Sequence, residues 1–445
     1  MVKVAIISDL HLGFGKGTER EEDPFVAAER AFETAKDRGA DLVVLAGDMF
    51  DTRLPRPEHW SRFMKLLSIF RDGKNAEVVK VEGRDEIPEQ CLEGIPVIAI
   101  HGTHERRGKG MKNTVEALED AGFIVHLHCA SMELEIGGEK IGIHGMSGVP
   151  EKYSKEVLEK WNPEPFPDAY NIFTLHQDLD PYIFNPANPP SLGLEDLPED
   201  FDLYVSGHIH WKDKQELKGG LFMIPGSLVP TQLREREAKM KKGFYILDTE
   251  KEETEFIGIR PPREFFYEDM EFEGKGPEEI EKRVESRLED TLSGSFGMKP
   301  LVRVKIKGEL PKGVSSNDVD LSRLKKKYGE DALLTFSVDL QEKGLEEKVE
   351  TLRNLREEKL SVDEMGMKIL REKTEETGAS VDPDLVFEDL VEGDLEDAMQ
   401  KLEEAKNGSY EEGDEDAEED GEDEREGKED EGVAEEEGQT EEWWK

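Results

Sequence analysis

Five short groups of polar residues, rich in aspartate and histidine, each follow directly after an apolar run that predicts a buried strand. The groups are Asp9-Leu10-His11, Gly47-Asp48, Gly102-Thr103-His104-Glu105, His176 and Gly207-His208-Ile209-His210. Open α/β sheets bind ligands at the carboxyl ends of their strands, so groups at five strand ends can meet in one crevice. The pattern therefore predicts an α/β fold with one polar site at the edge of its sheets.

Residues 1–255 alternate between apolar runs and amphipathic segments, which predicts one α/β domain. The run at residues 2–8 is apolar throughout, as expected for a strand buried on both faces. Phe25, Ala28 and Phe32 recur at helical spacing. We expect further strands at 42–46, 96–100, 123–127, 132–136, 140–144, 172–175, 203–206, 215–217, 221–224 and 243–247, and helices at 25–36, 60–70 and 111–121.

Arg260-Pro261-Pro262-Arg263 indicates a domain boundary, and we expect three further segments after the first domain. Residues 256–342 predict a small α+β domain. Residues 343–406 predict helices whose narrow apolar stripes cannot form a core of their own. Residues 407–445 consist largely of Glu, Asp and Gly, a composition typical of a disordered acidic tail.

The chain is strongly acidic, with a formal net charge of −46. Residues 407–445 hold 20 Asp or Glu against 3 Lys or Arg, so −17 of this charge lies in the tail and −29 on the rest. An acidic surface normally disfavours a polyanionic partner, but the Debye length falls to about 3 Å at 1 M salt. We therefore expect a halophile-like protein, whose acidity reflects a salt-rich cell rather than its substrate.

Only Cys91 and Cys129 are present, which is too few for a disulfide scaffold in a chain of this length. The apolar start of the chain is shorter than a signal peptide. No run approaches the roughly 18 apolar residues that cross a membrane. These features predict a soluble, cytoplasmic protein with no membrane partner.

The residue types in the five groups suit divalent metals, because imidazole and carboxylate ligands bind Mn, Fe and Zn. A spacing of two places Asp9 with His11, and His208 with His210, on the same side of an extended chain. Two ions about 3.5–4 Å apart would hold a phosphate and lower the pKa of a shared water. The groups therefore predict a two-metal site.

Each group has a plainer interpretation when it is taken alone. Gly47-Asp48 is typical of a turn, His176 is typical of a core or surface histidine, and His-x-His is as often chance as a metal site. All five would have to be coincidental at once, which favours the metal site. The histidines outside the pattern are expected to be structural: His59, His101, His126, His128 and His144.

The order of these groups resembles that of the calcineurin-like metallophosphoesterases, over about the first 210 residues. The resemblance implies a sandwich of two packed sheets flanked by helices, followed here by the small α+β capping domain. It implies two metal ions, usually manganese, with magnesium, iron or zinc as alternatives, and His104 as the catalytic histidine. The implied ligands are Asp9, His11, Asp48 and His210 for the first ion and Asp48, His176 and His208 for the second, with Asp48 bridging.

Further features are similar to the SbcD branch, known in archaea and eukaryotes as meiotic recombination nuclease eleven. They are Pro225-Gly226-Ser227, Lys242-Gly243-Phe244-Tyr245, the small domain after Pro261-Pro262 and the helical segment at 343–406. This resemblance implies a manganese-dependent DNA exonuclease and endonuclease that processes double-strand-break ends. The implied partners are DNA ends, an SbcC-type coiled-coil ABC ATPase bound by the helical segment, and a second copy in a homodimer.

Two positions depart from the family pattern. Thr103 stands where the family usually has an asparagine that ligates the second metal, and a threonine hydroxyl is a shorter and poorer ligand. Asp51 stands where the nuclease branch often has histidine, whereas the protein phosphatase branch has an aspartate that orients the catalytic histidine. We expect Thr103 to bind weakly or through water, and Asp51 to hydrogen-bond His104 and raise its pKa.

Basic residues lie near the motif loops despite the acidic composition, and we expect them to contact DNA phosphates. These residues are Arg53, Arg106, Arg107, Lys109 and Arg234. Ordinary surface ion pairs are the alternative. Two other functions stay open: a phosphoesterase for small-molecule or protein phosphoesters, which Asp51 favours, and a scaffold whose metal site Thr103 has disabled.

Overall fold

The computed structural model describes residues 1–342 except 74–75, 109, 184–189 and 191, together with 366–371, 383, 386–387, 391, 399 and 401. The helical segment expected at 343–406 lies largely outside the described residues, and the acidic tail expected at 407–445 lies wholly outside them. Within the described part of the chain, no helix is long and apolar enough to span a membrane.

Two sheets form the first part of the protein. The six-stranded sheet has the order β13 (Glu253–Gly258), β12 (Gly243–Asp248), β1 (Lys3–Ile7), β2 (Leu42–Ala46), β4 (Val97–Ile100) and β5 (Val125–His126). The seven-stranded sheet has the order β10 (Asp213–Leu217), β11 (Gly220–Ile224), β9 (Leu203–Ser206), β8 (Tyr170–Leu175), β7 (Glu139–Met146), β6 (Ala130–Ile136) and β3 (Glu77–Glu82). β1, β2, β4 and β5 are parallel, as are β7, β8, β9 and β11, so the ends of these strands share one edge in each sheet.

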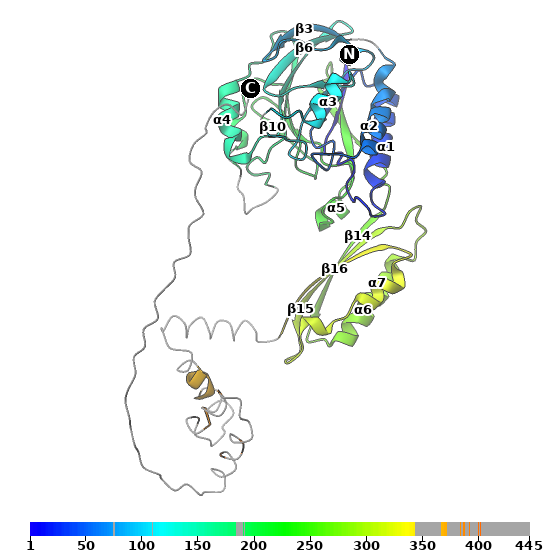
Figure 1. The fold of residues 1–445 in the computed structure, drawn as a ribbon, viewed down its shortest axis with the longest axis vertical. Helices are drawn as coiled ribbons and strands as arrows, with labels where there is room; N and C mark the ends of the chain where they lie inside the picture. The colour runs from blue at the N-terminus through cyan, green and yellow to red at the C-terminus, as the bar shows by residue number, and fades with distance from the viewer. Residues whose placement is uncertain are drawn as a thin grey trace, which may run out of the picture.

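Successive side chains on a strand point to opposite faces, so β1 contributes to two cores. Val4 and Ile6 pack between the two sheets, whereas Ala5 and Ile7 face helices outside the first sheet. Those helices are α1 (Asp23–Asp37), α2 (Pro57–Leu67) and α3 (Thr114–Asp120). α4 (Glu151–Trp161) packs on the outer face of the second sheet, on the opposite side from α1 and α2 (Figure 1). The expected sandwich of two packed sheets flanked by helices is confirmed.

A third sheet follows, made of β14 (Phe265–Glu273), β15 (Leu301–Leu310) and β16 (Leu333–Glu342), all parallel. α6 (Pro277–Thr291) and α7 (Ser322–Tyr328) join successive strands and lie on one face of this sheet (Figure 1). There Ile280, Val284 and Leu324 belong to a separate hydrophobic core. β13 runs to Gly258, past the boundary expected at residue 255.

Sequence patterns missed several elements of the fold, among them β3 and α4. β3 reads Glu-Val-Val-Lys-Val-Glu and is mostly exposed, so its sequence lacks the apolar face of a typical strand. α4 buries only Ser154, Val157 and Leu158, a stripe too narrow to stand out. The strands whose ends carry the polar groups were all expected, because they are buried on both faces.

Candidate metal centre

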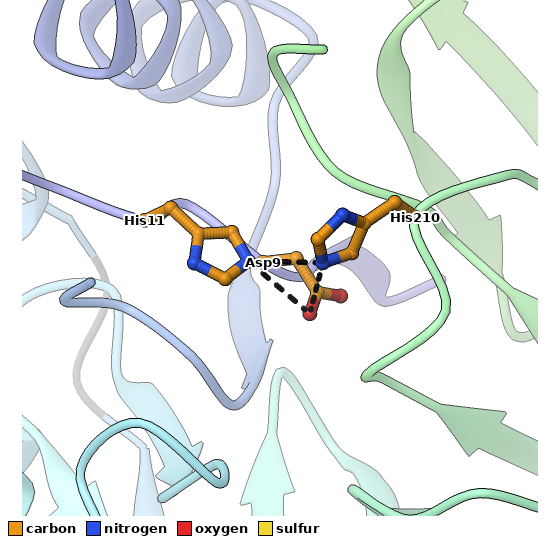
Figure 2. Close-up of side chains that lie close together, drawn as sticks. All are labelled: Asp9, His11 and His210. Atoms are coloured by element: carbon orange, nitrogen blue, oxygen red, sulfur yellow. Dashed lines mark hydrogen bonds and ion pairs between the residues drawn. The ribbon is translucent and has the colours of Figure 1, made fainter. Parts of the chain in front are cut away.

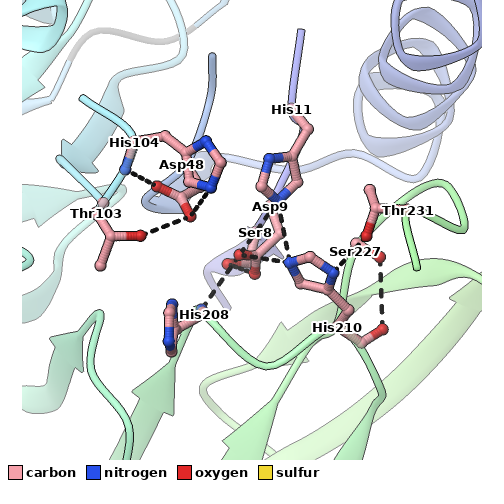
Figure 3. A network of polar contacts seen from close by, with 12 residues as sticks. Ser8, Asp9, His11, Asp48, Thr103, His104, His208, His210, Ser227 and Thr231 are labelled. Carbon is pink, nitrogen blue, oxygen red and sulfur yellow. Dashed lines mark hydrogen bonds and ion pairs between the residues drawn. The ribbon is translucent and has the colours of Figure 1, made fainter. Parts of the chain in front are cut away.

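The polar groups that follow β1, β2, β4, β8 and β9 meet in one place, although these strands belong to two sheets (Figure 3). Ligand atoms lie within 4.8 Å of one another in three sets. The sets are Asp9, His11 and His210; His11, Asp48 and His104; and Asp48, His176 and His208. Shared members join the sets into one continuous centre. The structure thus brings together every expected carboxylate and imidazole ligand, and their role as metal ligands stays a prediction.

Four of these residues have a left-handed backbone, which residues other than glycine rarely adopt. The φ angle is 52° at Asp9, 48° at His11, 49° at Asp48 and 76° at His208. Each such residue costs about 1–3 kcal/mol, and such strain gathers at functional sites. The extended geometry expected for Asp9 and His11 is therefore wrong, because tight turns after β1, rather than the pleat of a strand, direct both side chains to the centre.

Asp9, His11 and His210 make the first set (Figure 2). The Nε2 atoms of His11 and His210 lie 3.0 Å apart, and each lies 3.9 Å from Asp9 Oδ1. Burial lowers the pKa of His210 well below its usual value, so this ring is neutral near pH 7. Two imidazole nitrogens and a carboxylate that face one space form a donor set suited to a divalent cation.

Asp48, His176 and His208 make the second set. His176 Nδ1 lies 2.8 Å from the carbonyl oxygen of Ala46, so Nδ1 carries a proton and Nε2 faces Asp48 Oδ2 at 3.1 Å. Asp178 Oδ1 lies 3.3 Å from His208 Nε2. Carboxylates beside ligating histidines commonly fix the ring and its tautomer. No sequence pattern singles out Asp178, because its contact depends on where His208 lies.

The centre concentrates buried negative charge, and the pKa values of its members shift accordingly. Burial raises the pKa of Asp9, and it opposes ionisation of Asp48, but the neighbouring His176 holds the pKa of Asp48 well below its usual range. Burial lowers the pKa of His176, but the carboxylates of Asp48 and Asp9 outweigh it and raise the value to about 10. A divalent cation would neutralise the same carboxylates, and its binding would release the His176 proton.

His104 is the most exposed histidine of the centre, with 41% of its side chain accessible. Its Nδ1 lies 2.8 Å from the backbone oxygen of Asp51, and its Nε2 lies 4.0 Å from Asp48 Oδ2. The Asp51 carboxylate is 3.9 Å from His104 Nδ1 and only 3.3 Å from His11 Nδ1. Asp51 therefore hydrogen-bonds His104 through its backbone carbonyl rather than through its carboxylate, and the orienting role expected for Asp51 stays a prediction.

Thr103 places its hydroxyl beside the second set. The hydroxyl donates to Asp48 Oδ2 at 3.3 Å, the same oxygen that His176 Nε2 approaches. The position suits the weak or water-mediated contact to a cation that we expected, and ligation by Thr103 stays a prediction.

Glu105 has a role that the sequence did not reveal, although it lies in one of the five groups. The side chain is fully buried and accepts hydrogen bonds from the backbone N–H groups of Asp48, Phe50 and Gly102, at 3.1, 2.7 and 2.7 Å. Burial raises the pKa of Glu105 to about 7. Its carboxyl group thereby joins the turn after β2 to the turn after β4, and the two turns carry Asp48 and His104.

Three of the basic residues expected to contact DNA lie on loops next to His104. Arg53 is exposed, Arg106 and Arg107 are half-buried, and Arg107 donates to the backbone oxygen of Arg53 at 3.4 Å. Arg234 is exposed at the start of α5 (Glu235–Lys239), and Lys109 lies outside the described residues. DNA contact by these residues stays a prediction.

The chain is similar in sequence to several known proteins. Residues 2–212 match the sequence profile of the calcineurin-like phosphoesterases. The DNA double-strand break repair protein Mre11 of Methanopyrus kandleri is 27% identical over 305 residues, which cover 64% of this chain and 62% of that protein. Human double-strand break repair protein MRE11 is 26% identical over 363 residues, which cover 68% of this chain and 50% of that protein. A putative 5'-nucleotidase structure from Staphylococcus aureus is 15% identical with a TM-score of 0.34, over 58% of this chain and 53% of that chain.

The matched residues span 62% of one Mre11 relative and 50% of the other. The profile match reaches from β1 to just beyond His210, so it contains all five polar groups. The alignments with the repair proteins extend further, over more than 300 residues. Residues 2–212 carry the calcineurin-like phosphoesterase domain, and over more than 300 residues the chain is similar to the Mre11 DNA double-strand break repair proteins.

Proposed function

We propose that this protein is a metal-dependent phosphodiesterase that processes the ends of DNA double-strand breaks. The observation that carries the proposal is the meeting of three sets of mostly buried ligand atoms, one of which includes the exposed His104. The relatives are double-strand break repair proteins, which supports DNA as the substrate.

The ligand set fits two divalent cations, with manganese as the expected metal and magnesium, iron or zinc as alternatives. Asp9, His11, Asp48 and His210 would hold the first cation, and Asp48, His176 and His208 would hold the second, with Asp48 shared. When bound, the two cations would lower the pKa of a water and balance the charge of the phosphate.

His104 has the geometry of a proton carrier. The carbonyl of Asp51 can only accept a hydrogen bond, so Nδ1 of His104 must carry the proton of that bond. Nε2 is then the ring nitrogen outside that bond, and it lies 4.0 Å from Asp48 Oδ2 on a side chain that is 41% exposed. We assign to it the stabilisation or protonation of the leaving sugar oxygen.

DNA contacts and partners extend the proposal beyond the centre. Arg53, Arg106, Arg107 and Arg234 would contact DNA phosphates, and we propose the same for Lys109. We also propose a homodimer and an SbcC-type coiled-coil ATPase that binds residues 343–406. Support for the ATPase comes from the apolar stripes of that segment, which need a surface to cover them.

A nuclease assay on linear duplex DNA with manganese tests the proposal. His104→Ala is expected to slow hydrolysis by about 100-fold or more, while calorimetry still detects two bound manganese ions. Arg38→Ala is the control, because Arg38 is exposed and contacts Lys3 at the opposite end of β1 from the centre. It should keep wild-type activity.

Two results would contradict the proposal. Wild-type protein that hydrolyses small phosphoesters but leaves DNA intact would favour the phosphoesterase alternative. Wild-type protein that binds no cation would favour the scaffold. Asp51 is the residue that favours the phosphoesterase, and its carboxylate lies 3.9 Å from His104 Nδ1, beyond hydrogen-bond distance.

A further inference from the structure

A buried ion pair lies behind His210 and takes no part in the proposed chemistry. Lys242 Nζ and Glu237 Oε1 lie 2.9 Å apart, and only 7% and 5% of their side chains are exposed. Glu237 belongs to the short helix α5, and Lys242 directly precedes β12. Buried charges of this kind usually cost stability relative to apolar side chains of similar size. Because this pair lies next to His210, a candidate metal ligand, a function at that histidine would explain its burial.

Lys242 holds the backbone of His210. Its Nζ donates to the carbonyl oxygen of His210 at 2.8 Å and to Ser227 Oγ at 2.9 Å. Ser227 in turn contacts the same carbonyl oxygen at 3.5 Å (Figure 3). It also donates to Val229 O at 2.8 Å. The lysine thus fixes the main chain that carries the histidine.

Glu237 holds the loop that contacts the ring of His210. Its carboxylate accepts the backbone N–H groups of Gln232 at 2.9 Å and Thr231 at 3.3 Å. Thr231 Oγ1 lies 2.6 Å from His210 Nδ1 (Figure 3). With Nδ1 engaged by this hydroxyl, Nε2 is the nitrogen that faces His11 and Asp9.

We propose that Lys242 and Glu237 are positioning residues that together hold His210 as a ligand of the first cation, one through its backbone and one through its ring. The inference rests on the proposed metal-dependent function and adds two residues to it. This positioning role explains why both charged side chains are buried. Lys242 and Glu237 each make hydrogen bonds that lead to His210, and a pair of apolar side chains could not make these bonds.

Cation binding and folding have to be measured on the same variants, because loss of one buried charge also destabilises the fold. Lys242→Met is expected to lower the melting temperature and to weaken one of the two manganese-binding steps by about 10–100-fold. The double variant Lys242→Met/Glu237→Leu removes both charges. It is expected to regain melting temperature but not the affinity for manganese, since the contacts to His210 are still absent.

Two further variants serve as references. Lys239→Met removes an exposed lysine that pairs with Glu235 on the same helix, and it should change neither quantity. Asp178→Asn, beside His208, is expected to weaken the other binding step and so identifies which step belongs to the first cation.

The outcomes separate the possibilities. Wild-type protein without bound manganese contradicts the proposed function itself. Two results overturn only the positioning role, provided that the wild-type protein binds manganese. One is an unchanged affinity for manganese in folded Lys242→Met. The other is a double variant that regains both the melting temperature and the affinity for manganese. Should the double variant not fold, Glu237→Gln decides at a temperature where its circular dichroism is native: weakened binding supports the role, and unchanged binding overturns it.

Discussion

At the scale of single residues, the centre depends on glycines that let two chain segments touch. A Cβ atom on Gly102 would lie 2.1 Å from Asp48 Oδ1 and 2.4 Å from the backbone nitrogen of Asp48. No rotamer of a side chain relieves a collision with a backbone atom, so any larger residue must push the two turns apart. Glu105 holds the same two turns together from behind.

Gly102→Ala is therefore expected to displace Asp48, the residue shared by both cation sets. Manganese affinity should fall by at least about tenfold, as measured by calorimetry. Gly108→Ala is the matched control on the same loop, because an added Cβ there meets no atom within 4 Å. Equal affinities in the two variants would contradict the close approach.

At the scale of elements, a polar network crosses the buried middle of the second sheet. His144 on β7 contacts Ser131 Oγ on β6 at 2.8 Å and Asn171 Oδ1 on β8 at 3.1 Å, and Phe166 and Phe201 flank its ring. Burial lowers the pKa of His144 to about 4. The ring is neutral when folded, which agrees with the structural role expected for it.

This shift makes part of the stability dependent on pH. The folded pKa lies below the ordinary value of about 6.5, so the contribution is complete above that value and is lost as the pH falls toward about 4. Between pH 6.5 and 5 the free energy of unfolding should fall by about 2 kcal/mol more in wild type than in His144→Gln. Urea titrations of both proteins at constant salt give this difference. Parallel pH profiles would contradict the shift, because they would mean that folding leaves the pKa of His144 near its ordinary value.

At the scale of the whole molecule, a second buried ion pair joins the two-sheet part to the third sheet. Arg263 Nε donates to Asp23 Oδ1 at 2.8 Å, and Arg263 Nη1 donates to the carbonyl oxygen of Lys299 at 3.0 Å. Asp23 begins α1, and Lys299 lies just before β15. A further contact runs from Arg303 on β15 to the carbonyl oxygen of Gln232 at 3.4 Å, next to the loop that Glu237 holds.

Arg263→Met is expected to destabilise the protein by at most about 3–5 kcal/mol, because it leaves the buried Asp23 with Arg20 as its charged partner. Thermal melting and the rate of proteolysis between residues 259 and 264 measure the effect. Arg38→Met removes an arginine from the exposed pair with Glu255, and should cost less than about 1 kcal/mol. Similar losses in both variants would mean that the Asp23 pair does not secure the third sheet.

The fold class and the groups of the centre could be predicted from the sequence because their signals are local. A continuous apolar run such as residues 2–8 indicates a strand buried on both faces, and the polar group after it indicates the strand end. Parallel strands place their carboxyl ends together, so the strand ends within each sheet share an edge, whereas packing decided that the edges of the two sheets meet. Order and residue type were enough to propose Asp9, Asp48 and His176 as members of one site.

The tertiary structure alone decided how those residues act. The left-handed turns at Asp9 and His208, the backbone carbonyl that replaces the Asp51 carboxylate at His104, and the support of His210 by Lys242 all depend on contacts between distant segments. No local pattern encodes such contacts, because the partner of each group is set by how the two sheets and the loop at 226–237 pack. The residue types of the site and the strand ends could be predicted from the sequence. The tautomers, the hydrogen-bond partners and the buried charge pairs depend on packing.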